Sequence, residues 1–185
     1  MRLLAMACGV VLSIGVFAQV DSVVTGTVTG VIDGDTIKVQ LPEGPVHVRL
    51  AHIDAPESYQ PGGGAAARAL HARLMAQEVS LQVVSRNSEE RLVAVVLLGD
   101  ENVNAWMVKQ GHAWASRESS LDASYCAWED AARSLRRGLW SASDWVAPWD
   151  WRAARKDALF FVTDHSNAST ASCMRELRDA PVYDE

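Results

Sequence analysis

The sequence predicts an α+β fold, a small five-stranded β-barrel with about three helices. Three observations favour this class: strand-like alternation early in the chain, an Ala-rich helical stretch after the third strand, and an amphipathic helix late in the chain. The 185 residues, 49% hydrophobic and 22% charged, suit one globular domain and exclude a disordered or collagenous chain.

The first three strands are expected to pair in the order of a meander. Apolar and polar residues alternate within the second and third strands, and Asp33-Gly34 between the first two is a strong signal for a two-residue hairpin. The third strand is expected to end before Asp54, close to the proline that follows. The strands are expected over 23–32, 36–41 and 46–53.

Two more strands and three helices complete the prediction. Strands are expected over 79–84 and 92–98, and helices over 65–77, 103–110 and about 121–139. In the last helix Ser119 is the expected N-cap, Leu135 belongs to the apolar face, and Glu129 lies on another face among polar residues. Five strands with helices after the third and fifth are compatible with a barrel of the oligonucleotide/oligosaccharide-binding (OB) type.

The first eighteen residues are expected to be a secretory signal peptide. A positive start is followed by an apolar run over 3–17, and small residues at 16 and 18 suit cleavage after Ala18. The alternative is an uncleaved membrane anchor, although this run is short for a bilayer. The domain is then expected over 23–151, with 152–185 as a C-terminal extension. We expect a monomer, secreted or periplasmic, with no membrane attachment.

Cleavage would remove Cys8 and leave Cys126 and Cys173. Two cysteines in an exported protein suggest one disulfide. Two free thiols are the alternative, because the sequence does not fix the distance between these residues.

The acidic composition bears on the partner. The chain has 17 Lys and Arg against 23 Asp and Glu, which gives a formal net charge of −6. Taken alone, this charge argues against a nucleic-acid partner, because binding to phosphates normally requires a basic surface. A phosphate-bearing substrate would therefore need a site that recruits positive charge locally.

Carboxylates and one arginine gather around the first hairpin. Asp33 and Asp35 lie at the hairpin and Asp54 follows a strand that must run beside it, and such hard oxygen ligands suit Ca²⁺ or Mg²⁺. Arg49 and Glu57 complete the groups needed to attack a phosphodiester: cations to stabilise charge on the phosphoryl oxygens, and a carboxylate to orient or deprotonate water. The structural alternatives are a buried Arg49–Asp35 salt bridge and a Glu57 that caps a turn.

Two segments carry a resemblance to a known family. Residues 31–36 (VIDGDT) and 48–57 (VRLAHIDAPE) are similar to the two signature segments of the staphylococcal nuclease (thermonuclease) family. Weaker similarities follow in the right order, at residues 91–96, 103–104, 111–114 and 137–140. The resemblance runs from about Val23 to Trp151.

The resemblance implies a calcium-dependent nuclease with an OB-type barrel that hydrolyses phosphodiester bonds of DNA and RNA. It implies that the side chains of Asp35 and Asp54, with the carbonyl of Ala55, bind Ca²⁺. It also implies that Asp33 orients ligands and waters around that ion.

The same resemblance implies the catalytic residues. Arg49 and Arg91 match the arginines that clamp phosphate, and Glu57 matches the carboxylate that positions or activates the attacking water.

The chain departs from the family pattern in two places. Ser88-Glu89-Glu90 precedes Arg91 where the family usually has a basic residue, a tyrosine and a glycine, and Ala115-Ser116 stands where a tyrosine is usual. These changes remove a cation and two aromatic surfaces that could stack on bases. The rival interpretation is a non-catalytic barrel that binds nucleic acid or protein, although such a module needs no Asp35–Asp54 pair.

Overall fold

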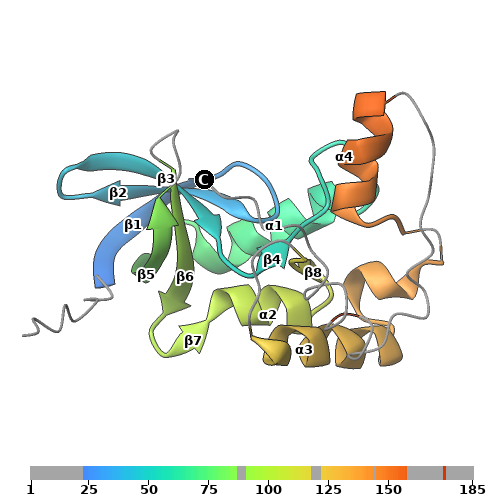
Figure 1. Ribbon diagram of the computed structural model, residues 1–185. Helices are drawn as coiled ribbons and strands as arrows, with labels where there is room; N and C mark the ends of the chain where they lie inside the picture. The colour runs from blue at the N-terminus through green and yellow to red at the C-terminus, as the bar shows by residue number, and fades with distance from the viewer. Residues whose placement is uncertain (1–22, 87–90, 118–121, 144, 158–172, 174–185) are drawn as a thin grey trace, which may run out of the picture.

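The structure is a computed structural model, and it describes residues 23–86, 91–117, 122–143 and 145–157 together with Cys173 (Figure 1). The expected signal peptide lies outside the described residues. So do Ser119 and the acidic pair Glu89-Glu90.

Five long strands form the barrel. They are β1 (Val23–Val31), β2 (Thr36–Leu41), β3 (Gly44–Leu50), β5 (Glu78–Arg86) and β6 (Leu92–Leu98). The first three pair antiparallel in the order of a meander, β5 adds to the other edge of β1, and β6 pairs antiparallel with β5. A parallel pairing of β3 with β6, in which Arg49 lies beside Val93, closes the sheet. The predicted five-stranded barrel is confirmed.

The barrel interior is filled by the apolar side of each strand. The alternation predicted for β2 and β3 places Ile37, Val39, Val48 and Leu50 in the core, while Lys38 and Gln40 face solvent. Helix α1 (Gly63–Leu74) covers the barrel with its buried Leu70 and Leu74, as the sequence predicted.

Three short strands lie between the barrel and the helices. Strand β4 (Ile53–Asp54) pairs antiparallel with β8 (Trp114–Ala115) in a separate small sheet, and β7 (Glu101–Asn102) leads into helix α2 (Val103–Lys109). The buried side chain of Asn104 donates to the carbonyl oxygens of Ala51 and Ala94, at 2.8 and 3.0 Å. Helix α2 is thus tied to β6 and to the turn that follows β3.

The amphipathic helix α3 (Ala123–Ser134) is shorter than expected and begins later. Its N-cap is Asp122, whose carboxylate accepts a hydrogen bond from the Ser124 amide at 2.8 Å, so the prediction of Ser119 was wrong. The helix ends because Arg136 takes a φ of 51°, in the left-handed region, and a short 3-10 helix follows over Gly138–Ser141. Leu135 is consequently 61% exposed, so its predicted place on the apolar face was wrong.

A fourth helix, α4 (Pro148–Asp157), exceeds the predicted three and spans the expected boundary between Trp151 and Arg152. In Figure 1 the barrel stands on the left, α2 and α3 lie along the bottom, and α4 stands at the upper right. No helix in the described part of the chain is long and apolar enough to cross a membrane.

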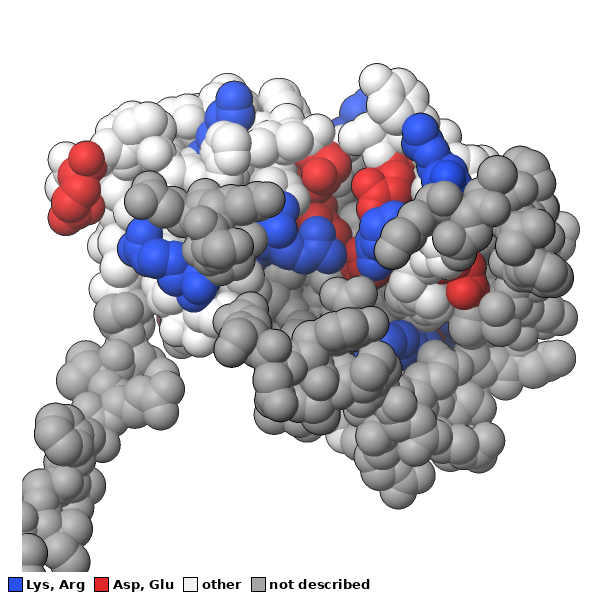
Figure 2. All heavy atoms as spheres, turned by 45° about the horizontal axis from the view of Figure 1, so that its top comes forward, with Lys and Arg blue, Asp and Glu red and all other residues white. Residues whose placement is uncertain are grey.

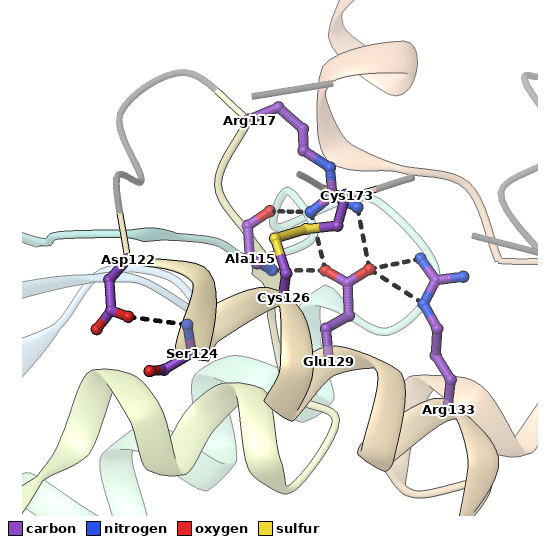
Figure 3. The surroundings of a disulfide bond; sticks show 8 residues. All are labelled: Ala115, Arg117, Asp122, Ser124, Cys126, Glu129, Arg133 and Cys173. Atoms are coloured by element: carbon purple, nitrogen blue, oxygen red, sulfur yellow. Dashed lines mark hydrogen bonds and ion pairs between the residues drawn. A yellow bond between two sulfur atoms is a disulfide. The ribbon is translucent and has the colours of Figure 1, made fainter. Parts of the chain in front are cut away.

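Cys126 of α3 is joined to Cys173 by a disulfide, which is the first of the two alternatives that the sequence left open (Figure 3). Both cysteines are buried against the main hydrophobic core. Part of the C-terminal extension is therefore held covalently to α3.

Candidate active site

The hairpin between β1 and β2 holds Asp35 in a buried position. Its side chain is only 4% exposed, and its Oδ2 accepts a hydrogen bond from the Ala55 amide at 2.9 Å. The Asp35 amide donates to Asp33 Oδ1 at 3.0 Å, so Asp33 orients the hairpin. Glycine is required at residue 34 because a Cβ there would lie 2.6 Å from the Cβ of Ala55.

Arg49 joins the two buried carboxylates. Its Nη1 lies 2.9 Å from Asp35 Oδ1 and its Nη2 lies 3.2 Å from Asp54 Oδ1. Asp54 comes from β4, whose pairing with β8 places it opposite Trp114. The salt bridge that the sequence offered as a structural alternative is thus present, yet the Arg49 side chain remains 28% exposed and within reach of solvent.

A second arginine, which the sequence did not single out, enters the same site from α4. The guanidinium of Arg152 contacts both oxygens of Asp54, at 3.0 and 2.8 Å, and Glu57 Oε1 at 3.0 Å. This is the bidentate geometry that favours arginine over lysine. We call Asp35, Arg49, Asp54, Glu57 and Arg152 the carboxylate–arginine cluster.

Glu57 sits in a turn that another residue caps. Its amide donates to the side-chain oxygen of Gln60 at 3.1 Å, and its carbonyl accepts from the Gln60 amide at 2.8 Å. The Gln60 side chain also donates to the carbonyl of Val146, just before α4, at 2.6 Å. The turn is therefore capped by Gln60, and the Glu57 carboxylate points to Arg152 instead.

The two remaining sequence-predicted residues lie beside the cluster. Arg91 is half-buried and stands one residue before β6, whose Leu92 pairs with Val48 on the strand that carries Arg49. Ala55 is buried next to Asp54, and its amide is the group that contacts Asp35. The structure thus brings together the four predicted side chains Asp35, Arg49, Asp54 and Glu57, and places Arg91 just before the neighbouring strand β6.

The buried negative charge is incompletely balanced. Burial is the largest effect on Asp35 and raises its pKa to about 7 despite the nearby Arg49, and the charges of Asp33 and Asp54 add to the rise. For Arg49, burial opposes the charged form, but the carboxylates of Asp35 and Asp54 outweigh it and raise the pKa above its usual value. The Arg49 guanidinium therefore stays charged. A further cation next to Asp35 would stabilise the ionised form of its carboxylate.

The donor chemistry fits a hard divalent cation. The side chains of Asp35 and Asp54 offer buried carboxylate oxygens, which is the ligand type that Ca²⁺ prefers. Among the described residues, no group of three or more His, Cys, Asp or Glu side chains could hold a metal. A cation bound here would therefore take further oxygens from the backbone or from water.

The surface has the same mixture of charges. Figure 2 shows acidic side chains flanked by basic ones in a hollow of the face that lies at the top of Figure 1. Local pairing of this kind places positive charge beside the carboxylates, although the whole chain has a net charge of −6.

A buried ion network supports the strand next to Asp54. The carboxylate of Glu129, on α3, is 2% exposed and accepts hydrogen bonds from the Ala115 amide at 2.8 Å and from Arg117 and Arg133 (Figure 3). Its predicted place on a polar face was wrong. Because Ala115 belongs to β8, Glu129 holds the strand that pairs with β4 and so positions Asp54.

Comparison with known proteins identifies the family. The family model described as "Staphylococcal nuclease homologue" matches residues 47–142, which is 96 of the 185 residues. The chain belongs to the staphylococcal nuclease family.

Similar members of this family cover most of the chain. It is 39% identical to a protein named "Micrococcal nuclease" from Shigella flexneri, over 83% of this chain and 94% of that protein. It is 36% identical to an "Uncharacterized endonuclease" from Escherichia coli O157:H7, over 69% of this chain and 84% of that protein. It is also 34% identical to an "Uncharacterized endonuclease" from Haemophilus influenzae, over 74% and 78%.

The segment matched by the staphylococcal nuclease model does not include the whole cluster. It contains Arg49, Asp54 and Glu57, whereas Asp35 precedes it and Arg152 follows it. The sequence did not indicate a role for Arg152, because this residue lies 98 positions from Asp54 in the chain. A helical pattern over 148–157 could have indicated α4, but it carries no information on where that helix packs.

Proposed function

We propose that this protein is a calcium-dependent nuclease that hydrolyses phosphodiester bonds of DNA and RNA. The observation that carries the proposal is the convergence of Asp35, Arg49, Asp54 and Glu57 in one cluster of ion pairs, on a chain of the staphylococcal nuclease family. The names of the relatives, a micrococcal nuclease and endonucleases, support the same activity.

The arginines and Glu57 have different roles in the proposed reaction. Arg49, and Arg91 just before the adjacent strand β6, supply fixed positive charge for the phosphoryl oxygens, which gain negative charge as water attacks. Glu57 is half-buried and holds its carboxylate at the edge of the cluster, where it can orient a water or accept its proton.

Asp35, Asp54 and the carbonyl of Ala55 would hold Ca²⁺. A bound divalent cation polarises a phosphoryl oxygen and offsets its charge. The contribution of the protein is to keep these ligands buried and oriented: Asp35 by the hairpin and the Ala55 amide, and Asp54 by the pairing of β4 with β8.

The test is digestion of DNA and RNA by the purified protein lacking residues 1–18. We expect cleavage of both polymers with Ca²⁺, its loss on addition of EGTA, and its return with excess Ca²⁺. Glu57→Gln should lower kcat by about 10²- to 10⁴-fold if the carboxylate acts on the attacking water. Glu101→Gln, at a glutamate outside the cluster, is the matched control and should leave the rate unchanged.

The same assay tests the rival interpretation of a non-catalytic binding module. If neither polymer is cleaved at high enzyme concentration with Ca²⁺, while tryptophan fluorescence still reports binding of oligonucleotide, the binding module is correct. Cleavage that persists in EGTA would refute calcium dependence alone.

We also propose that the mature protein is an exported monomer. The disulfide between Cys126 and Cys173 supports an oxidising compartment, because such bonds are rare in the cytosol. The exposed large apolar side chains of the described residues, such as Val23, Met75 and Leu135, come from separate segments of the chain. The N-terminal sequence of the exported protein and its mass in solution by light scattering test the two statements.

A further inference from the structure

A cleft next to Glu57 has the composition of a nucleotide-binding site. It has a volume of about 320 Å³, within the range of small-molecule sites. One wall is the loop after β4 and the other is α4. The lining residues are Glu57, Ser58, Tyr59, Trp151, Arg152 and Arg155.

Each wall of the cleft contributes an aromatic ring. Tyr59 is 85% exposed, so packing in the core does not explain an aromatic residue at this position. Trp151, on α4, is half-buried and lines the same cleft. Exposed aromatic rings beside cations are the usual means by which proteins stack unpaired bases.

The cations of the cleft are continuous with the carboxylate–arginine cluster. Arg152 lines the cleft and at the same time contacts Asp54 and Glu57. Arg155 follows three residues later, on the same face of α4, and is exposed. A strand bound in the cleft would thus lie directly beside the group expected to act on water.

We propose that α4 and the loop carrying Tyr59 form a subsite for one unstacked nucleotide next to the phosphodiester that is cleaved. The base stacks on Tyr59 and Trp151, and Arg155 binds the adjoining phosphate. A cleft of this size takes a single strand and not a duplex. The inference rests on the proposed nuclease function for its position beside the scissile bond, but binding in the cleft can be measured without cleavage.

The first test therefore measures the binding of a fluorescein-labelled single-stranded oligonucleotide by fluorescence anisotropy, in EDTA and at low salt. The double variant Tyr59→Ala/Arg155→Ala removes a stacking ring and a phosphate contact, and it should weaken binding by at least about 5- to 150-fold, the loss expected for the stacked base alone. Tyr59→Phe keeps the ring and should bind as the parent does. Lys38→Ala removes one exposed cation from β2, outside the cleft, and is the control for charge alone.

A double variant that binds like Lys38→Ala would overturn the proposal. So would an equal loss of affinity for a duplex of the same sequence, because the subsite is for an unstacked nucleotide. Circular dichroism checks that the variants fold, which their exposed positions lead us to expect.

The second test separates the subsite from the reaction. With Ca²⁺, the double variant should raise KM for the single-stranded oligonucleotide about as much as it raises Kd, while kcat changes less than about twofold. Its rate on bis(4-nitrophenyl) phosphate, which has no neighbouring nucleotide, should equal that of the parent protein. A fall in the kcat of the double variant on both substrates would overturn the subsite. A parent protein that cleaves neither substrate would refute the proposed function, and the binding comparison would still test the subsite.

Discussion

Replacing Glu129 with glutamine should destabilise the protein strongly, although the residue lies outside the carboxylate–arginine cluster. Its buried carboxylate lies between the guanidinium groups of Arg117 and Arg133, whose side chains are each only 8% exposed. Glutamine keeps the shape but removes the charge, and its NH₂ group would face hydrogen-bond donors (Figure 3). The group that both buried guanidinium groups contact would then be neutral.

The magnitude follows from burial. Removing one partner of a buried ion pair costs about 3–5 kcal/mol. Aromatic rings offset part of this loss, since the guanidinium of Arg133 lies 4.1 Å from the ring centre of Trp140 and that of Arg117 lies 5.1 Å from Trp149. We therefore expect Glu129→Gln to lower the free energy of unfolding by about 3 kcal/mol, which corresponds to a fall in Tm of about 6–12 °C for a chain of this size.

The assay is urea unfolding followed by tryptophan fluorescence. Glu101→Gln is the matched control, because Glu101 pairs with Arg73 at side-chain exposures of 36% and 39%, where an ion pair contributes at most about 1 kcal/mol. A loss below about 1 kcal/mol for Glu129→Gln would refute the reasoning. It would mean that the buried carboxylate contributes no more than an exposed one.

Three further predictions concern the metal, the pH and the disulfide. Arg152→Ala should lower the Ca²⁺ concentration at half-saturation in a tryptophan fluorescence titration, because the guanidinium no longer competes for both oxygens of Asp54; a higher concentration would contradict this. In EDTA, Asp35→Asn should become more stable relative to the parent protein as the pH rises from about 4 to 7, by up to about 4 kcal/mol, and the difference should then level off. The reason is that the pKa of Asp35 is raised from 3.8 to about 7 in the folded parent protein, so that Asp35 ionises in the unfolded chain at a lower pH than in the folded one. The folded parent protein therefore loses stability over this range, and the asparagine variant does not. Urea midpoints of the two proteins that differ equally at every pH would contradict the prediction. Replacing Cys126 and Cys173 with serine should cost about 4 kcal/mol by chain entropy, since the disulfide spans 47 residues, and dithiothreitol should then leave the variant's urea midpoint unchanged.

The barrel could be predicted from the sequence because its signals are local. Alternation along β2 and β3 reports which side of each strand is buried, and Asp33-Gly34 indicated that the first two strands are neighbours. The predicted two-residue hairpin was wrong, because residues 32–35 connect β1 to β2. Proximity of Asp35, Arg49 and Asp54 follows from that register, since Thr36 lies opposite Arg49. The family resemblance then implied metal-binding and catalytic roles for residues that the predicted meander had already placed close together.

Glu129 was misplaced because helical periodicity assigns polar residues to solvent. That rule holds where no partner is available, but Arg117 and Arg133 supply one, and the Ala115 amide adds a donor that belongs to another element. The prediction for Leu135 was wrong for a different reason. Helix α3 ends before this residue, so the helical periodicity that placed it on the apolar face does not apply to it. Each error reflects a contact or a chain reversal that local spacing does not encode.

Arg152 also bears on the acidic composition. A net charge of −6 argued against a phosphate-bearing partner, but the cluster pairs Asp35, Asp54 and Glu57 with Arg49 and Arg152. A cation that binds the aspartates would compete with both guanidinium groups for the same oxygens, and each arginine released from a carboxylate becomes available to a phosphate. Binding of metal and binding of substrate should therefore favour each other, which the anisotropy assay can measure by repeating the oligonucleotide titration of a Glu57→Gln variant with Ca²⁺ in place of EDTA. Affinity that does not increase with Ca²⁺ would show that the arginines stay with the carboxylates.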